Sequence, residues 1–103
     1  MKLTIKGRLI LLQVLPETGN IITLKMVREL REGLSFDDDE IREIELIDDV
    51  ENGRTSWNKD KEPFKDVPVG DSMMDLVKGI LVKLNEDEAL GIDYIELWDK
   101  FCG

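Results

Sequence analysis

Histidine is missing from this chain of 103 residues, and cysteine occurs once, at Cys102. Without histidine, Ser-His and Cys-His activation of a nucleophile is excluded, and the commonest ligand of transition metals is lost. A lone thiol forms no intrachain disulfide and, without a partner ligand, no zinc site. A glycine-rich phosphate loop of the P-loop or Rossmann type is also missing. The sequence therefore gives no support for an enzyme, and we expect no catalytic residue and no cofactor.

Long hydrophobic runs are missing too. The apolar stretch over residues 9–15 has seven residues and includes Gln13, which makes it too short for a signal peptide or a bilayer span. With 42% apolar and 36% charged residues, the chain can bury one modest core. We therefore expect a single domain over residues 1–103 in a reduced, cytoplasmic setting, with no membrane contact.

Charge is distributed unevenly along the chain, whose net value is −9. Residues 1–31 hold six basic groups against Glu17 and Glu29, a net charge of +4, so the remainder carries −13. This asymmetry indicates that the N-terminal part faces an acidic surface, which belongs either to the chain itself or to a partner.

Three helices are predicted in the first 44 residues. Thr4 can cap a helix that runs to about Leu15 and is apolar on nearly every face, which is typical of a buried central helix. Thr23 can cap a second helix, because apolar residues recur behind it at helical spacing. Ser35 can begin a short third helix that contains the acidic run Asp37, Asp38, Asp39 and Glu40 and turns Ile41 and Ile44 inward.

A β-hairpin is predicted after the third helix. Residues 45–50 and 54–58 read as two short strands, and the turn Glu51-Asn52-Gly53 between them contains the dipeptide Asn-Gly, a strong signal for a tight hairpin. Residues 1–58 are thus expected to form helices plus a hairpin.

Two helices are predicted in the remainder. Residues 59–70 are polar, contain two prolines and read as an extended connector. A helix capped by Asp71 or Ser72 should follow, and Gly91 should separate it from a last helix. That last helix has two apolar flanks, one formed by Ile92, Ile95, Trp98 and Cys102 and the other by Tyr94, Leu97 and Phe101. Residues 71–103 then form a C-terminal helix pair, and the fold class is α+β, mainly helical.

Three helices followed by a hairpin resemble the winged-helix arrangement. In that fold the third helix enters the major groove of DNA and the hairpin, or wing, contacts phosphates. From Phe36 to Glu51, however, nine carboxylates stand against Arg42 alone, a net charge of −8. Because duplex DNA is a dense row of negative charge, we expect no docking of a duplex through the third helix.

Residues 85–97 resemble part of an EF-hand calcium loop between two helices. The residues that match ligand positions of such a loop are Asn85, Asp87, Asp93 and Glu96. Ala89 departs from the pattern, because an oxygen ligand belongs at its position, and Leu90 stands where the loop has glycine for a sharp turn. The resemblance implies a weak calcium site over residues 85–96, and the departures favour an ordinary helix–turn–helix connection.

Much of the chain is also similar to small uncharacterised proteins encoded by bacteriophages and prophages. The similarity rests on scattered residues: Met1-Lys2-Leu3-Thr4-Ile5-Lys6, Leu11-Leu12, Leu15-Pro16-Glu17, Thr23-Leu24-Lys25, Arg28-Glu29-Leu30-Arg31-Glu32, Leu34-Ser35-Phe36 and Trp57-Asn58. It implies a bacterial cytoplasmic setting and a role in the interplay of phage and host, and it carries no site residue with it.

A protein-interaction or regulatory module is the function that these features favour. We expect its surface to comprise Asp37, Asp38, Asp39, Glu40 and Trp57, since an aromatic side chain in polar surroundings is a common interface anchor. The partner would be a protein, with a basic protein as one alternative, bound by a monomer or a homodimer. A narrower alternative is a DNA mimic, whose carboxylates imitate phosphates and occupy a host protein that binds nucleic acid.

Overall fold

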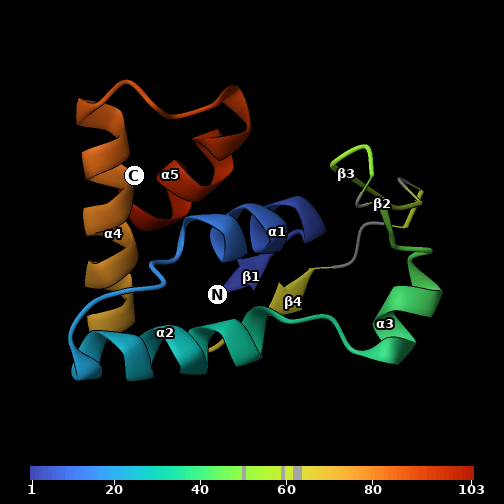
Figure 1. Cartoon of the computed structure of the whole chain (residues 1–103), viewed down its shortest axis with the longest axis horizontal. Coiled ribbons are helices and arrows are strands. Elements are labelled where there is room, and N and C mark those ends of the chain that lie inside the picture. The colour runs from blue at the N-terminus through green and yellow to red at the C-terminus, as the bar shows by residue number, and fades with distance from the viewer. Residues whose placement is uncertain (50, 59, 62–63) are drawn as a thin grey trace.

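The computed structural model shows an α+β protein in which helices predominate, as the sequence predicts (Figure 1). It describes residues 1–49, 51–58, 60–61 and 64–103. The helices are α1 (Ile5–Val14), α2 (Ile21–Leu34), α3 (Asp38–Glu43), α4 (Asp71–Glu86) and α5 (Ile95–Phe101), with a 3-10 turn, η1 (Ile92–Tyr94), directly before α5. The strands are β1 (Lys2–Leu3), β2 (Ile47–Asp49), β3 (Arg54–Ser56) and β4 (Lys65–Asp66).

Helix α1 lies at the centre of the molecule, between α2 and α5 (Figure 1). Its predicted cap is confirmed, because the hydroxyl of Thr4 accepts a hydrogen bond of 3.0 Å from the backbone N–H of Gly7. One hydrophobic core joins α1 to α2, α4 and α5, and also to β1 and the residue that follows β4. Its buried members are Leu3, Ile10, Leu11, Leu15, Val27, Leu30, Leu34, Val67, Val77, Leu81, Leu97 and Phe101. None of the helices among the described residues combines the length and the apolar character needed to cross a membrane.

Two of the predicted helix caps lie at the wrong residue. Helix α2 is capped by Asn20, whose side chain accepts the N–H of Thr23 at 2.9 Å, so Thr23 lies inside the helix that it was expected to cap. Helix α3 is capped by Asp37, whose carboxylate accepts the N–H of Glu40 at 2.7 Å. Ser35 instead ends α2, where its hydroxyl donates to a carbonyl of the last turn. In both cases a better acceptor for the first turn stands within three residues of the predicted cap.

The start of α4 also differs from expectation, and the structure shows which of the two apolar flanks of α5 is buried. Gly70, not Asp71 or Ser72, is the cap of α4, and it makes no side-chain hydrogen bond. On α5 the buried flank is the one with Leu97 and Phe101, because these residues meet the core formed with α4 and α1. The other flank is exposed at Ile92 and Ile95.

The predicted hairpin is present but shorter. Strands β2 and β3 pair antiparallel, with Ile47 opposite Ser56 and Asp49 opposite Arg54. Glu45, expected in the first strand, has a positive φ of 56° and precedes it. The expected end of that strand, Val50, lies outside the described residues.

The connector contains a strand that the sequence did not reveal. Within the expected extended segment 59–70, β4 pairs antiparallel with β1, placing Lys2 opposite Asp66 and Leu3 opposite Lys65. Residues 59, 62 and 63 of this segment lie outside the described part of the chain. The pairing brings Val67 into the core beside Leu3, where both are fully buried.

Replacing Gly53 by Ala should destabilise the protein by about 1 kcal/mol, because a left-handed backbone is costly for any residue with a Cβ. Gly53 has φ +63°, and the new Cβ would have no atom within 4 Å, so the cost is one of backbone conformation alone. Gly79 is the matched control, since it is exposed in the middle of α4 and also has open space around it. There the same substitution should stabilise by up to about 1 kcal/mol. Urea unfolding measures the change in the free energy of unfolding for each variant. If the two changes had the same sign, the turn assigned to Gly53 would be contradicted.

Candidate functional site

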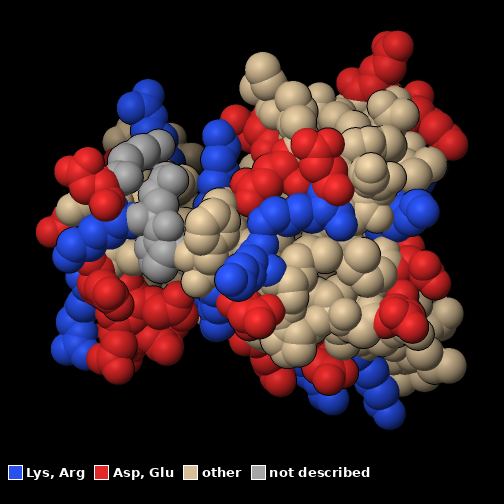
Figure 2. All heavy atoms as spheres, turned by 180° about the vertical axis from the view of Figure 1, so that it is seen from behind, with Lys and Arg blue, Asp and Glu red and all other residues tan. Residues whose placement is uncertain are grey.

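The acidic lobe, defined as the described residues from Phe36 to Asn58, comprises α3 and the β2–β3 hairpin. It lies to one side of α1, away from α4 and α5 (Figure 1). Seen from behind, carboxylates gather over this part of the molecule, at the left of Figure 2. The lobe is therefore the region where the surface expected from the sequence must be sought.

A buried arginine of α1 connects the lobe to the helices. Arg8 is 1% exposed, and its guanidinium donates to the carboxylate of Glu40 at 2.7 Å. Its Nε donates to the carbonyl of Leu34 at 3.1 Å, and Nη2 donates to the carbonyl of Ser35 at 2.8 Å. Because these carbonyls end α2 and the carboxylate belongs to α3, one side chain joins three helices. A buried guanidinium needs this full set of acceptors to offset its desolvation.

The environment of this ion pair favours the charged form of Glu40. The hydrogen bond from Arg8 lowers the pKa of the Glu40 carboxyl below its ordinary value of 4.5, against an opposing contribution from partial burial. Lys65 of β4 adds a second positive charge, 3.6 Å from the same carboxylate. The ring of Phe36 stacks on the guanidinium, with 3.8 Å between ring centroid and Cζ. Glu40 is thus the anchor of α3, and its carboxylate is turned toward the molecule's own cations.

Replacing Glu40 by Gln should make the stability of the protein less dependent on pH below about 4.5. A carboxyl whose pKa is lowered by folding contributes stability above its unfolded pKa and loses it as the pH falls through the folded value. The variant should therefore be less stable than the parent at pH 7, and the two should converge in acid. Thermal unfolding between pH 3 and pH 7 measures the difference, and a constant difference across this range would contradict the anchor.

The other three members of the acidic run have separate roles. Asp37 caps α3, Asp38 is exposed in its first turn, and Asp39 pairs with Arg42 one turn later on the surface. Their negative charge at the start of a helix is locally favourable. The run expected to act as one surface is therefore divided between a structural anchor and exposed carboxylates.

The hairpin contributes to the acidic lobe a groove of mixed polarity, in which Ile47 and Trp57 are the apolar members. Trp57 is half-buried and lines a cleft of about 250 Å³ between α1 and the hairpin on one side. On the other side it lines a shallow groove of about 700 Å³ with Glu45, Ile47, Ser56 and Asn58. Ile47 is 61% exposed there. The sequence indicates Trp57 but not Ile47, because a strand of three residues shows no clear alternation.

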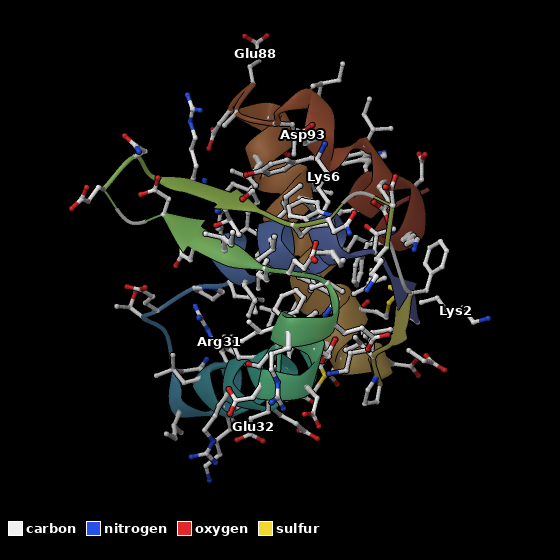
Figure 3. The ribbon with its side chains drawn as sticks, turned by 90° about the vertical axis from the view of Figure 1, so that its right-hand side faces the viewer. Lys2, Lys6, Arg31, Glu32, Glu88 and Asp93 are labelled. Atoms are coloured by element: carbon white, nitrogen blue, oxygen red, sulfur yellow. The ribbon has the colours of Figure 1, made fainter. Side chains whose placement is uncertain are left out.

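The residues that resemble calcium ligands have other positions and partners. Asn85 lies in the last turn of α4 and Asp87 caps its end. Asp93 pairs with Lys6 of α1 at 2.6 Å, and Glu96 accepts the hydroxyl of Thr4 at 2.9 Å. Figure 3 shows Asp93 and Lys6 side by side, whereas Glu88 points away from the molecule. No group of three or more carboxylates or thiols able to hold a metal occurs in the described ranges.

No protein-family model, no curated protein and no solved structure matches this chain. The assignment of a function therefore rests on its own residues.

The positive charge of the N-terminal part has a partner within the molecule. Arg8 pairs with Glu40 of α3, and Lys6 pairs with Asp93 of η1. Of the two explanations of the charge asymmetry, these pairs support the chain's own acidic surface. The carboxylates of the lobe that remain exposed are then the ones available to an external partner.

Proposed function

We propose that this protein is a small acidic interaction module whose acidic lobe binds a basic protein partner. The observation that carries the proposal is the groove beside Ile47 and Trp57, an apolar centre in a surface that is otherwise rich in carboxylates. Exposed apolar and aromatic groups with a charged margin are typical of interface anchors.

The margin of the groove determines the charge of the partner. Glu45 lines it, and Asp38 and Glu43 are exposed on α3 of the same lobe. Within the described part of the chain no salt bridge engages these three carboxylates. A cationic surface would gain attraction on approach and would suffer little desolvation at such exposed groups. We therefore expect an association rate that falls as the salt concentration rises.

The winged-helix-like order of elements is part of this proposal. Helix α3 and the hairpin would hold the places of a recognition helix and a wing, but with a charge that repels a duplex. A protein partner fits this charge, and the resemblance to phage-encoded proteins supports a bacterial cytoplasmic setting. In the DNA-mimic form of this proposal, the carboxylates imitate phosphates and the partner is itself a nucleic-acid-binding protein.

Affinity capture from a bacterial lysate at low and high salt tests the proposal. The protein should retain a basic partner at about 50 mM salt and release it at several hundred millimolar, where screening is strong. A variant with Asp38, Glu43 and Glu45 changed to Lys should retain nothing. Its control carries Lys at Asp75 and Asp99, which are exposed on α4 and α5, and should behave like the parent.

Equal capture by the charge-reversed variant would overturn the proposal, and so would capture that is independent of salt. Competition by duplex DNA for the captured partner would select the DNA-mimic form, and its absence would select the general module.

A further inference from the structure

A second apolar surface lies where α4 ends and α5 begins. A pocket of about 240 Å³ is lined there by Leu90, Tyr94, Ile95 and Trp98, together with Asn85 and Gly91. Beside it Ile92 is 83% exposed and Ile95 57% exposed. We call this pocket and the two isoleucines the C-terminal corner. Two neighbouring isoleucines left in solvent next to an apolar pocket indicate a binding surface.

The margin of the C-terminal corner is acidic. Glu86, Asp87 and Glu88 follow one another from the last residue of α4 into the loop and are all exposed. Over the described residues no ion pair involves them. Glu88 extends into solvent at the top of Figure 3. An occupant of this corner must therefore offer apolar side chains flanked by positive charge.

The first turns of α2 offer such a combination in the same chain. Ile21 is 65% exposed and Ile22 70% exposed, and Lys25 and Arg28 follow on the exposed side of the helix. Ile21, Lys25 and Arg28 surround a shallow depression of about 200 Å³ with Leu24. The N-terminal end of a helix of 14 residues adds a partial positive charge. We call Ile21, Ile22, Lys25 and Arg28 the α2 face.

The two surfaces cannot meet within one molecule. In Figure 1, α2 begins at the lower left and the loop from α4 to α5 crosses the top, with α4 running between the two levels. A helix of 16 residues such as α4 is about 24 Å long. The complementary surface must therefore come from another copy of the chain.

We propose that the α2 face of one molecule docks into the C-terminal corner of the next. The aliphatic side chains of Ile21 and Ile22 enter the region of the pocket, while Lys25 and Arg28 lie against the carboxylates of the margin. Since the two surfaces differ, the contact is head to tail, and an open assembly keeps a vacant α2 face at one end and a vacant C-terminal corner at the other. Such a contact produces open chains or closed rings.

Two single substitutions test this arrangement. Ile22→Asp blocks the α2 face and Ile92→Asp blocks the C-terminal corner, and both positions are so exposed that the fold should be retained. The parent protein should show a mass that rises with concentration up to about 1 mM in sedimentation equilibrium, because small interfaces associate weakly. Each variant alone should stay monomeric. Ile47→Asp, at a position of the acidic lobe that is 61% exposed and belongs to neither surface, should assemble like the parent.

An equimolar mixture of the two variants gives the decisive result. Each still has one intact surface that fits the intact surface of the other, so the mixture should form a dimer and nothing larger. A monomeric parent at every concentration would overturn the proposal, as would a mixture that stays monomeric. Self-association of Ile22→Asp alone would show a symmetric contact through the C-terminal corner and would equally contradict it. Capture of a basic partner by the acidic lobe does not depend on any of these results.

Discussion

Replacing Arg8 by Met is expected to lower the free energy of unfolding by about 3 kcal/mol, because breaking a buried ion pair leaves the remaining charge without its partner. The carboxylate of Glu40 would lose its closest donor, and the carbonyls of Leu34 and Ser35 would lose theirs. Methionine retains much of the apolar stem of arginine. The loss in the free energy of unfolding therefore reports the missing guanidinium and not a large cavity. Glu40 is 25% exposed, and water can replace some of the lost interaction, which places the effect toward the lower end of the usual range.

Arg42→Met is the matched control for this prediction. Arg42 also pairs with an aspartate of α3, but its side chain is 77% exposed and that of Asp39 is 88% exposed. Such a pair contributes at most about 0.5 kcal/mol. Guanidinium chloride unfolding, followed by far-UV circular dichroism, compares the two variants with the parent. If both substitutions lowered the free energy of unfolding by the same small amount, Arg8 would not hold the acidic lobe to the helices.

Replacing Leu11 by Ala is the second large effect, with an expected loss of about 3 to 4 kcal/mol. Leu11 is fully buried on α1 in the core shared by α2, α4 and α5. The smaller side chain would lose its transfer free energy and leave a cavity that well-packed neighbours fill incompletely. Ile92→Ala removes a comparable amount of apolar side chain from a position that is 83% exposed.

The Ile92→Ala control should therefore change the free energy of unfolding by less than about 0.5 kcal/mol, as is usual for surface positions. Thermal and chemical unfolding of the two variants measure the contrast. A loss below about 1 kcal/mol at Leu11 would place this residue outside a tightly packed core.

The parts of the fold that the sequence predicts are those with a local physical signal. Thr4 precedes an apolar helix and can accept only from that helix, so the cap of α1 follows directly from the pattern. Asn52-Gly53 favours a tight turn because glycine adopts a positive φ without a steric penalty, and φ at Gly53 is 63°. Gly91 lies in the break between α4 and η1, but its φ is −83°, and the positive φ of that loop belongs to Glu88.

The parts that could not be predicted depend on choices between near neighbours or on distant contacts. Asn20 and Thr23 are both good caps, and the sequence does not show which one the chain leaves outside the helix. The β1–β4 ladder consists of two residues on each side, separated by more than 60 positions, and such short strands have no recognisable periodicity. In the same way, nothing near Arg8 in the sequence reveals that it is buried.

The sequence indicates which residues could form a site but not how they are arranged. The acidic run and Trp57 were identified from charge and residue type. The role of Glu40, however, depends on Arg8, which lies 32 positions earlier, and no local pattern connects the two. Ile47 was missed because a hairpin strand of three residues alternates too briefly to show which side chain remains in solvent.

The central structural claim is that Glu40 anchors the acidic lobe through its ion pair with Arg8. A double-mutant cycle with Arg8→Met, Glu40→Gln and the double variant tests this most directly. We expect the two residues to be coupled by about 2 kcal/mol in the free energy of unfolding, as residues in one buried network usually are. A parallel cycle at Arg42 and Asp39 should give at most about 0.5 kcal/mol. Additive effects at Arg8 and Glu40, with a coupling below about 0.3 kcal/mol, would contradict the claim.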